Sequence, residues 1–490
     1  MQFLHLSCWK KRPKTPVECI CVVNLLIKSF GMQFFRGVVQ LCRLLVGSLF
    51  IVSGLIKSND AMGFMYKLEE YFEPGALNLP GLEEYALSLS VLICIGEILL
   101  GVAMVIGALP KLTATLTGVL MAFFTWLTWY TANCDPFATK MIVDTTGASI
   151  EIANQCVLAC GCFGNAIPLT PYESFLKDLV LSVLTVPILI GAFNGWTRLN
   201  EKREGLVLIT GSLVVIYAFG AGMLQWNFPV LFAAISYAVA EGLKVRFSSK
   251  YREWIMAAGV IVVCGFFQYY TLNHLPIKDY RPYAVGESII ENRKTADELG
   301  KEAPQYATEY TFKNLETKED TIILSTDWIK IYNEPWFKEG FETVSFDGDE
   351  VKLSEGYEPL IMDFQIVDGI GEDVVDDILQ FSLLQGDVLI HVSKDLDAGA
   401  GLGQEALNML ATQAMKEGWK VIGLTNAPFD QNESYRTEFN APYPFYTCDQ
   451  TELKIVVRSN PGLVWIRGGI IQEKWSWRDV PTFDALVDSF

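Results

Sequence analysis

The chain has 490 residues, of which 51% are hydrophobic and 19% charged, whereas soluble globular proteins carry about 25% charged residues. The net charge of −18 is uneven: from His274 onward there are 19 Lys and Arg against 39 Asp and Glu, and the part before it is close to neutral. Binding to nucleic acid needs clustered basic side chains, so the composition excludes nucleic acid as a partner of the acidic half.

The first half contains apolar segments long enough to cross a bilayer, which takes roughly 20 predominantly apolar residues. The strong segments are 37–55, 85–107, 113–130, 174–193, 206–226 and 254–272. A further segment, 228–240, is short for a full span. We therefore expect the chain to lie in a lipid bilayer and to cross it six or seven times.

Basic residues give the orientation, because Lys and Arg collect in cytoplasmic loops. They precede the first span and follow both the fourth span and the short segment 228–240. If all of these stretches are cytoplasmic, the short segment crosses the membrane and the C-terminal half lies outside. The charges therefore favour seven spans, a cytoplasmic N-terminus and a periplasmic C-terminal domain. The sequence leaves open whether Met1 or Met32 is the start.

The C-terminal half is mixed up to about residue 384, with short β-like pieces at 321–324 and 360–367. After Gly386 the sequence predicts strands that alternate with helices. These are a strand at 387–392, a helix at 403–417, a strand at 420–424, a helix at 451–458 and a hairpin formed by 463–466 and 470–475. Strand, helix, strand, helix and a final hairpin is the order of a thioredoxin-like domain.

These patterns predict an α-helical membrane bundle followed by a soluble α/β thioredoxin-like domain. We divide the chain into a cytoplasmic segment, a four-helix membrane domain, additional membrane helices, a periplasmic linker region with short strands, and the thioredoxin-like domain. The corresponding ranges are 1–36, 37–195, 196–273, 274–384 and 385–490.

Four of the eleven cysteines fall in one loop between the third and fourth spans: Cys134, Cys156, Cys160 and Cys162. Cysteines in an oxidising compartment pair or perform redox work. A disulfide within Cys160-Gly-Cys162 is strained and therefore labile. Cys134 and Cys156 are alternative partners for either of those two, and four cysteines allow three connectivities. Structural staples and a redox centre both fit the spacing. No metal site is predicted, because paired C-x₂₋₄-C knuckles are missing.

Several motifs resemble the DoxX/MauE-type family of membrane proteins. The most specific is Cys160-Gly-Cys-Phe-Gly164, which is followed by Leu169-Thr-Pro-Tyr-Glu-Ser-Phe-Leu-Lys-Asp178. Thr170 to Glu173 within it reads as a helix capping box. Ser53-Gly-Leu-Ile-Lys57 and Lys67-Leu-Glu-Glu-Tyr-Phe72 also match. The stretches 274–283 and 458–463 resemble the long Bacteroidota members, which add a periplasmic thioredoxin-like domain. The resemblance covers roughly residues 41–475.

The resemblance implies an integral inner-membrane protein with a four-helix core. MauE-type proteins are associated with maturation of a disulfide-rich periplasmic enzyme, and DoxX-type proteins with membrane oxidoreductase complexes and quinones. We therefore expect thiol–disulfide exchange or electron transfer through Cys160 and Cys162. The expected cofactor, if there is one, is a quinone, and the expected partner is an envelope protein or a membrane complex.

The thioredoxin-like domain departs from a redox-active pattern. The stretch 393–401, where a C-x-x-C is expected, contains no cysteine, and Cys448 is the only cysteine after residue 273. The domain is therefore expected to bind a partner in a groove framed by Asn460, Pro461 and Gly462, with Pro461 as a cis-proline. This favours an alternative function, a non-enzymatic accessory that binds envelope proteins or a membrane complex.

Three charged residues lie in or at the ends of predicted spans: Arg43, Lys57 and Glu97. A charge in the bilayer is costly unless it is paired, so such residues are functional candidates. We predict that Arg43 pairs with Glu97 across the first two spans, because their estimated depths are similar. A buried structural pair is the simpler interpretation of this pairing.

Overall fold

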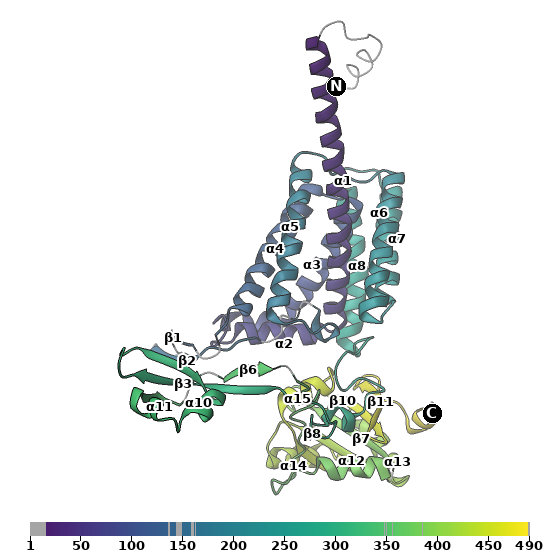
Figure 1. Ribbon diagram of the computed structural model, residues 1–490. Coiled ribbons are helices and arrows are strands. Elements are labelled where there is room, and N and C mark those ends of the chain that lie inside the picture. The colour runs from purple at the N-terminus through teal and green to yellow at the C-terminus, as the bar shows by residue number, and fades with distance from the viewer. Residues whose placement is uncertain are drawn as a thin grey trace. The chain divides into compact units, whose positions relative to one another are not determined.

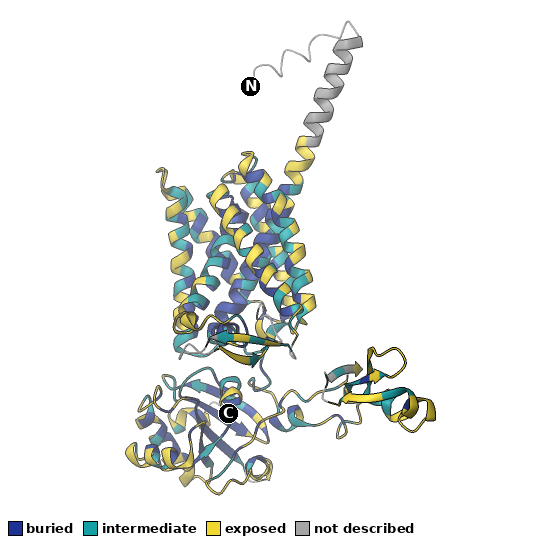
Figure 2. Ribbon diagram, turned by 90° about the vertical axis from the view of Figure 1, so that its left-hand side faces the viewer, coloured by how far each residue is buried: buried dark blue, intermediate teal, exposed yellow. Residues whose placement is uncertain are grey.

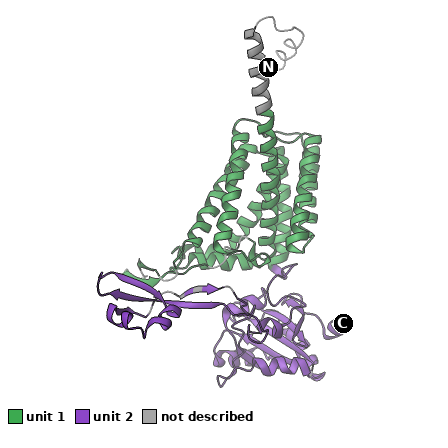
Figure 3. Cartoon of the chain, in the orientation of Figure 1, with its two compact units in different colours: residues 1–272 green, residues 273–490 purple. Residues whose placement is uncertain are grey.

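The computed structural model describes residues 16–135, 138–143, 149–157, 161, 163–346, 348, 350–354, 356–384 and 386–488. The chain divides into two compact units, Met1–Leu272 and Asn273–Phe490 (Figure 3). Each unit has its own buried core (Figure 2).

The first unit is a helical bundle (Figure 1). Its long helices are α1 (Pro16–Asn59), α3 (Ala86–Ile106), α4 (Pro110–Ala132), α5 (Pro171–Phe193), α6 (Lys202–Phe219), α7 (Phe228–Arg246) and α8 (Arg252–Asn273). A π-helical turn, η3 (Gly220–Leu224), extends α6. Within the described residues, seven helices are long and apolar enough to cross a membrane. The chain is therefore an integral, multi-pass membrane protein.

Helix α7, the sixth of these seven in chain order, covers the segment that looked too short in the sequence. The apolar run ends at Ala240, but the helix continues to Arg246. Glu241 lies one turn before Lys244 and the two side chains form an ion pair of 2.9 Å. Such pairs stabilise a helix, so charged residues extend α7 past its apolar part.

Helices α1 and α3 pack closely along glycines. A Cβ atom added to Gly101 would lie 2.6 Å from the carbonyl oxygen of Gly47, a distance that no real side chain tolerates. Small residues of this kind let membrane helices approach each other. The close contact sets the register between α1 and α3 and so decides which polar side chains meet.

Short elements cover one end of the bundle. Helix α2 (Ala61–Phe72) lies across that end (Figure 1) and buries Phe64, Leu68 and Tyr71 against α3 and α4. Its first turn is capped by Asp60, whose carboxylate accepts from the Gly63 N–H at 3.0 Å. The other elements are η1 (Pro80–Tyr85), the antiparallel hairpin of β1 (Thr139–Val143) and β2 (Ser149–Ala153), and η2 (Gly164–Ala166).

The second unit is built on a five-stranded sheet in the order β11-β10-β7-β8-β9. The strands are β7 (Asp387–Ser393), β8 (Lys420–Thr425), β9 (Phe445–Thr447), β10 (Gly462–Arg467) and β11 (Ile470–Ser476). Strands β7, β8 and β9 are parallel, and β10 and β11 are antiparallel to their neighbours. The Asn460–Pro461 peptide bond before β10 is cis, as predicted.

Helices cover both faces of this sheet. One core holds α12 (Val375–Leu384) and α15 (Gln450–Val456), and the other holds α13 (Gln404–Lys416), α14 (Phe429–Glu438) and α16 (Phe483–Asp488). The sequence predicted β7, α13, β8, α15 and the final hairpin. It missed α14, β9 and α12, which precedes the boundary placed at residue 385.

A second sheet precedes these elements. Strand β3 (Gln305–Asn314) pairs with β4 (Asp320–Leu324), β5 (Phe341–Ser345) and β6 (Glu350–Ser354). Short helices α10 (Ser325–Ile331) and α11 (Pro335–Gly340) accompany it, and α9 (Ile289–Arg293) lies earlier in the chain. The predicted strand at 321–324 is confirmed as β4. The one at 360–367 is wrong: Ile361, Phe364 and Ile366 enter the core from irregular backbone.

Candidate functional site

A disulfide closes the hairpin at the end of the bundle. Cys134 follows α4, Cys156 follows β2, and their sulfurs are bonded with the Cα atoms 5.7 Å apart. The hairpin base is also tied to the α2 end of the bundle, because the Gln155 N–H donates to the Gly75 carbonyl at 2.7 Å. Cys134 and Cys156 therefore pair with each other, and the alternatives in which they pair with Cys160 or Cys162 are not formed.

The candidate redox cysteines, Cys160 and Cys162, lie outside the described residues, so their role stays a prediction. The described residues beside them pack on the bundle. A Cβ atom added to Gly161 would lie 3.4 Å from the Lys67 Cγ of α2. Phe163 is buried, with its ring 5.6 Å from that of Phe219 and 5.0 Å from the Lys177 Nζ.

The predicted capping box at the start of α5 is confirmed. The Thr170 N–H donates to Glu173 Oε2 at 2.9 Å, and the Glu173 N–H donates to the Thr170 hydroxyl at 3.2 Å. The Glu173 carboxylate thus already lies at the positive end of this helix. This negative charge opposes the stabilisation that the positive end of the helix dipole gives to a nearby thiolate.

The intramembrane charges pair differently from the prediction. Glu97 pairs with Lys57, whose Nζ lies 2.8 Å from both carboxylate oxygens. Lys57 Nζ also donates to the Ser53 hydroxyl at 2.7 Å and lies 5.5 Å from the Phe124 ring. The two side chains are 2% and 3% exposed. The predicted Arg43–Glu97 pair is wrong, because the register of α1 and α3 places Lys57, not Arg43, opposite Glu97.

Arg43 instead caps the end of α3. Its guanidinium donates to the carbonyl oxygens of Met104 at 3.0 Å and Val105 at 3.2 Å, and to Asn200 Oδ1 at 3.0 Å. Gln40 Oε1 accepts a fourth bond at 2.5 Å. The last carbonyls of a helix lack partners within the helix, and a cation there also meets the negative end of the dipole. Arg43 is therefore a structural residue of the bundle.

In the second unit, the loop after β7 is bonded to the loop that carries the cis-proline. Asn460 Nδ2 donates to the Asp395 carbonyl at 2.7 Å, and the Asp395 N–H donates back to Asn460 Oδ1 at 3.3 Å. Lys394 is 7% exposed, and its Nζ donates to the Arg458 carbonyl at 2.9 Å. The groove at Asn460, Pro461 and Gly462 stays a prediction: Pro461 is buried, and Gly462 lies in β10 packed against Val457.

The stretch 274–283 fastens the start of the second unit to its core. Asp279 pairs with Arg281 at 2.7 Å and with Lys474 of β11 at 2.5 Å, and Tyr283 donates to Glu452. Burial opposes ionisation of Asp279, but the two cations hold the pKa of its carboxyl well below the usual range. Burial lowers the pKa of Lys474 to about 8. These residues carry part of the family resemblance, and their contacts are structural.

A buried polar network that sequence reasoning missed crosses the second unit. The Tyr443 hydroxyl accepts from Gln404 Nε2 at 2.9 Å and shares a hydrogen bond of 3.0 Å with His391 Nδ1. The other ring nitrogen, His391 Nε2, is buried and has no hydrogen-bond partner among the described residues. Burial lowers the pKa of His391 to about 4. No sequence motif marks these contacts, which join distant segments.

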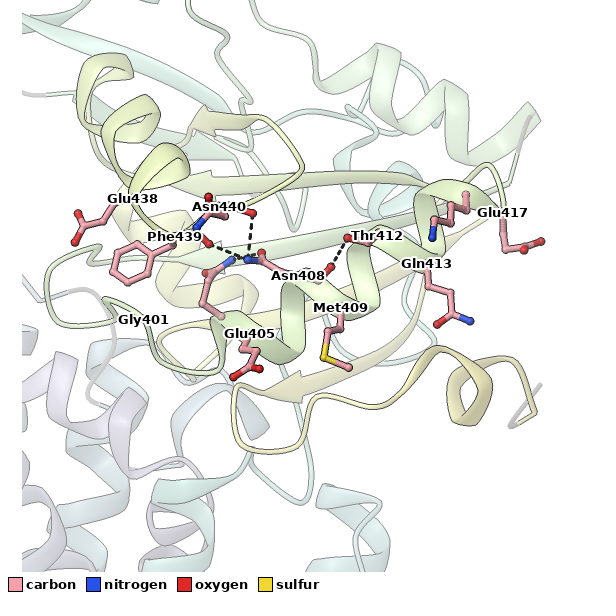
Figure 4. Close-up of a pocket in the computed structure, with 12 residues that line it drawn as sticks. Gly401, Glu405, Asn408, Met409, Thr412, Gln413, Glu417, Glu438, Phe439 and Asn440 are labelled. Atoms are coloured by element: carbon pink, nitrogen blue, oxygen red, sulfur yellow. Dashed lines mark hydrogen bonds between the residues drawn. The ribbon is translucent and has the colours of Figure 1, made fainter.

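The network ends at a hollow of about 870 Å³ between α13 and the end of α14 (Figure 4). Asn408 lies at its centre and donates to the carbonyl oxygens of Phe439 at 2.8 Å and Asn440 at 3.2 Å. It thereby caps the end of α14. Over the described ranges, no group of three or more His, Cys, Asp or Glu side chains is placed to hold a metal ion.

Comparison with known protein families gives a match to part of the membrane unit. No curated protein matches the chain, and no solved structure matches it. The matching region includes the Ser53–Lys57 and Lys67–Phe72 motifs, α2, α3 and α4, and ends just after Cys134. Residues 36–135 match the family model described as methylamine utilisation protein MauE, which confirms the MauE part of the resemblance over these residues.

Proposed function

We propose that this chain is an inner-membrane thiol–disulfide exchange protein that supports the maturation of envelope proteins, with Cys160 and Cys162 as the exchanging pair. The observation that carries the proposal is the Cys134–Cys156 disulfide. It uses two of the four cysteines of this loop as a structural staple and leaves Cys160 and Cys162 as the remaining pair. The neighbouring described residues Gly161 and Phe163 pack against the membrane bundle.

The proposed reaction oxidises a client dithiol. A client thiolate attacks one sulfur of the Cys160–Cys162 disulfide, that S–S bond breaks, and a mixed disulfide forms. The second client thiolate then displaces the pair, which leaves as two thiols while the client gains a disulfide. Two electrons and two protons pass from this dithiol to a quinone in the bilayer, which becomes a quinol and restores the disulfide.

The second unit is proposed to be a thioredoxin-like domain that recognises the client. Three parallel strands followed by an antiparallel hairpin, with helices on both faces of the sheet, support this fold. Its only cysteine, Cys448, is 3% exposed and lies in the core. Binding rather than electron transfer is the role that fits these residues.

The redox state of the cysteines tests the proposal. Cells are quenched with acid, free thiols are labelled with maleimide-PEG, and the mass shift is compared with and without an added reductant. We expect Cys160 and Cys162 to cycle, and the Cys160→Ser and Cys162→Ser variants to capture mixed disulfides with clients. The paired Cys134→Ser and Cys156→Ser variant is the control, because it removes the staple and keeps the exchanging pair.

The second candidate is a non-enzymatic accessory whose thioredoxin-like domain binds envelope proteins or a membrane complex. The Asn460–Asp395 hydrogen bonds favour this second candidate. They join the loop after β7 to the loop before β10, at the position where a redox-active thioredoxin-like domain carries its two free cysteines. If Cys160 and Cys162 never change redox state and their serine variants keep full function, this candidate replaces the first. Capture of mixed disulfides excludes it.

A further inference from the structure

The sheet of β3, β4, β5 and β6 in the second unit carries a continuous cluster of aromatic side chains. Residues two apart along a strand share a face of the sheet, so Tyr310 and Phe312 of β3 lie on the same face. The Trp328 ring of α10 lies 5.4 Å from that of Tyr310, and the Phe337 ring of α11 lies 5.1 Å from that of Phe312. Helices α10 and α11 therefore pack on this face (Figure 1). The other members of the aromatic cluster, each with its ring 4.9–5.7 Å from another ring of it, are Tyr332, Trp336, Phe341 and Phe346.

Much of this aromatic cluster is open to solvent. Phe312 and Phe337 are 1% and 5% exposed, whereas Tyr332, Trp336 and Phe346 are 42%, 55% and 46% exposed. Three large rings thus meet solvent while they contact the rest of the cluster. Rings in such a position bury a large area when a partner covers them, at a small cost in side-chain entropy. Contiguous exposed apolar surface of this kind marks a site of interaction.

The hydrophobic core beneath the aromatic cluster is small. Among the described residues of 305–354, the buried hydrophobic side chains are those of Ala307, Phe312 and Phe337. A sheet of three or four strands is stable only when one of its faces packs on a hydrophobic layer. The layer on this face is therefore incomplete, and a partner that covers the three exposed rings extends it.

The charge of the same segment decides between classes of partner. Residues 305–354 carry five lysines against eleven Asp and Glu side chains. A second copy of the chain would bring this acidic surface against itself, and juxtaposed like charges oppose such an association. An anionic membrane surface attracts basic segments, so it is also a poor match for this acidic one. A protein segment with apolar and basic side chains matches both the rings and the charge.

We propose that the aromatic cluster is a docking surface for an unfolded protein segment that combines apolar and basic side chains. Its apolar side chains contact the exposed rings of Tyr332, Trp336 and Phe346. Its basic side chains are attracted by Glu334 and Glu339, which are exposed and lie within three residues of Trp336 in the sequence. Identifying this partner with a client of thiol–disulfide exchange rests on the proposed function. The surface itself contains no cysteine and precedes the thioredoxin-like domain in the chain.

The test measures the binding of dye-labelled unfolded proteins to the full chain, purified in detergent, by fluorescence anisotropy. Ribonuclease A that is reduced and alkylated with iodoacetamide is the basic probe, and α-lactalbumin treated in the same way is the acidic probe. Alkylation prevents thiol exchange with either probe. The ring variant, Tyr332→Ser with Trp336→Ser, removes two exposed rings and leaves the buried ones in place. Ile322→Ser is its matched control: Ile322 is 61% exposed and pairs with Thr311, so it lies on the other face of the same sheet.

We expect saturable binding of the basic probe, weakened about tenfold or more in the ring variant, because a few aromatic side chains carry most of the energy of an interface. Ile322→Ser should bind like the natural chain, and the acidic probe should bind more weakly than the basic one. A second variant, Glu334→Gln with Glu339→Gln, should weaken binding of the basic probe alone. High salt should abolish this second effect, because it screens exposed charges.

The absence of saturable binding, equal binding by the natural chain and the ring variant, or equal binding of the two probes overturns the proposal. Two further outcomes assign the surface to another partner and also overturn it. Binding that is lost when the chain is moved from detergent into a phosphatidylcholine bilayer shows that the rings meet lipid. A mass by light scattering that halves in the ring variant shows that they meet a second copy. Thiol cycling of Cys160 and Cys162 is measured separately, so either proposal can fail without the other.

Discussion

Replacing one partner of the Lys57–Glu97 pair tests directly how much this buried ion pair contributes to the stability of the membrane unit. In Lys57→Met, the Glu97 carboxylate keeps its buried position, with 3% of its side chain exposed, and loses both 2.8 Å bonds. Breaking a buried pair in this way costs about 3–5 kcal/mol. For a unit of this size, that corresponds to a drop in melting temperature on the order of 10 °C.

The double variant Lys57→Met with Glu97→Gln separates charge from packing. It leaves no buried ion, so we expect its stability to stay within about 1 kcal/mol of the natural chain. Melting curves of the purified protein in one detergent measure all variants. Lys202→Met is the control, because Lys202 is exposed at the start of α6. A single variant that melts no lower than the double variant would refute the buried pair.

Three further predictions follow from single contacts. Arg43→Leu strips partners from two helix-end carbonyls and from Asn200, so we expect a loss of at least about 2 kcal/mol in the same melting assay. Cys134→Ser removes a disulfide that joins residues 22 positions apart, and loop closure of this length stabilises the folded hairpin by about 3 kcal/mol. We therefore expect a protease to cut the hairpin faster in the variant, and equal rates of proteolysis would contradict this prediction. His391 has a pKa near 4 in the folded chain, below the unfolded value of about 6.5. The folded state therefore binds fewer protons, and its stability is complete above pH 6.5 and falls by up to about 3 kcal/mol as the pH drops towards 4. Hydrogen exchange of β7 across this range should show the loss, and His391→Phe should remove that dependence on pH.

Much of the architecture follows from local sequence patterns. The apolar runs, the capping box at Thr170 and the strand at 387–392 each depend on residues close together in the chain, and each agrees with the structure. Helix α14 was missed because it is mostly polar, and its packing comes mainly from Tyr435 and Asn432. A helix without a continuous apolar stripe gives no periodic signal, so only its tertiary contacts define it.

Contacts between distant segments were not predictable from the sequence. Three charged residues were recognised as costly, but their partners depend on the register of α1 and α3, which the approach of Gly47 to Gly101 sets. Likewise, Tyr443 and His391 are 52 residues apart, and nothing in either local pattern points to the other. Asn460 was expected to border a groove, whereas its bonds to Asp395 emerge only when two loops meet.

The groups that surround the three intramembrane charges therefore separate Arg43 from Lys57 and Glu97. Arg43 is enclosed by helix-end carbonyls and amide oxygens, all of which its guanidinium satisfies, so its charge is fully explained by the stability of the bundle. Lys57 and Glu97 neutralise each other and line a cavity of the membrane unit. A buried ion pair alone adds little stability compared with apolar side chains of the same volume. Stability alone therefore does not account for this pair: the double variant, which replaces both charges together, should melt close to the natural chain, whereas Arg43→Leu should not.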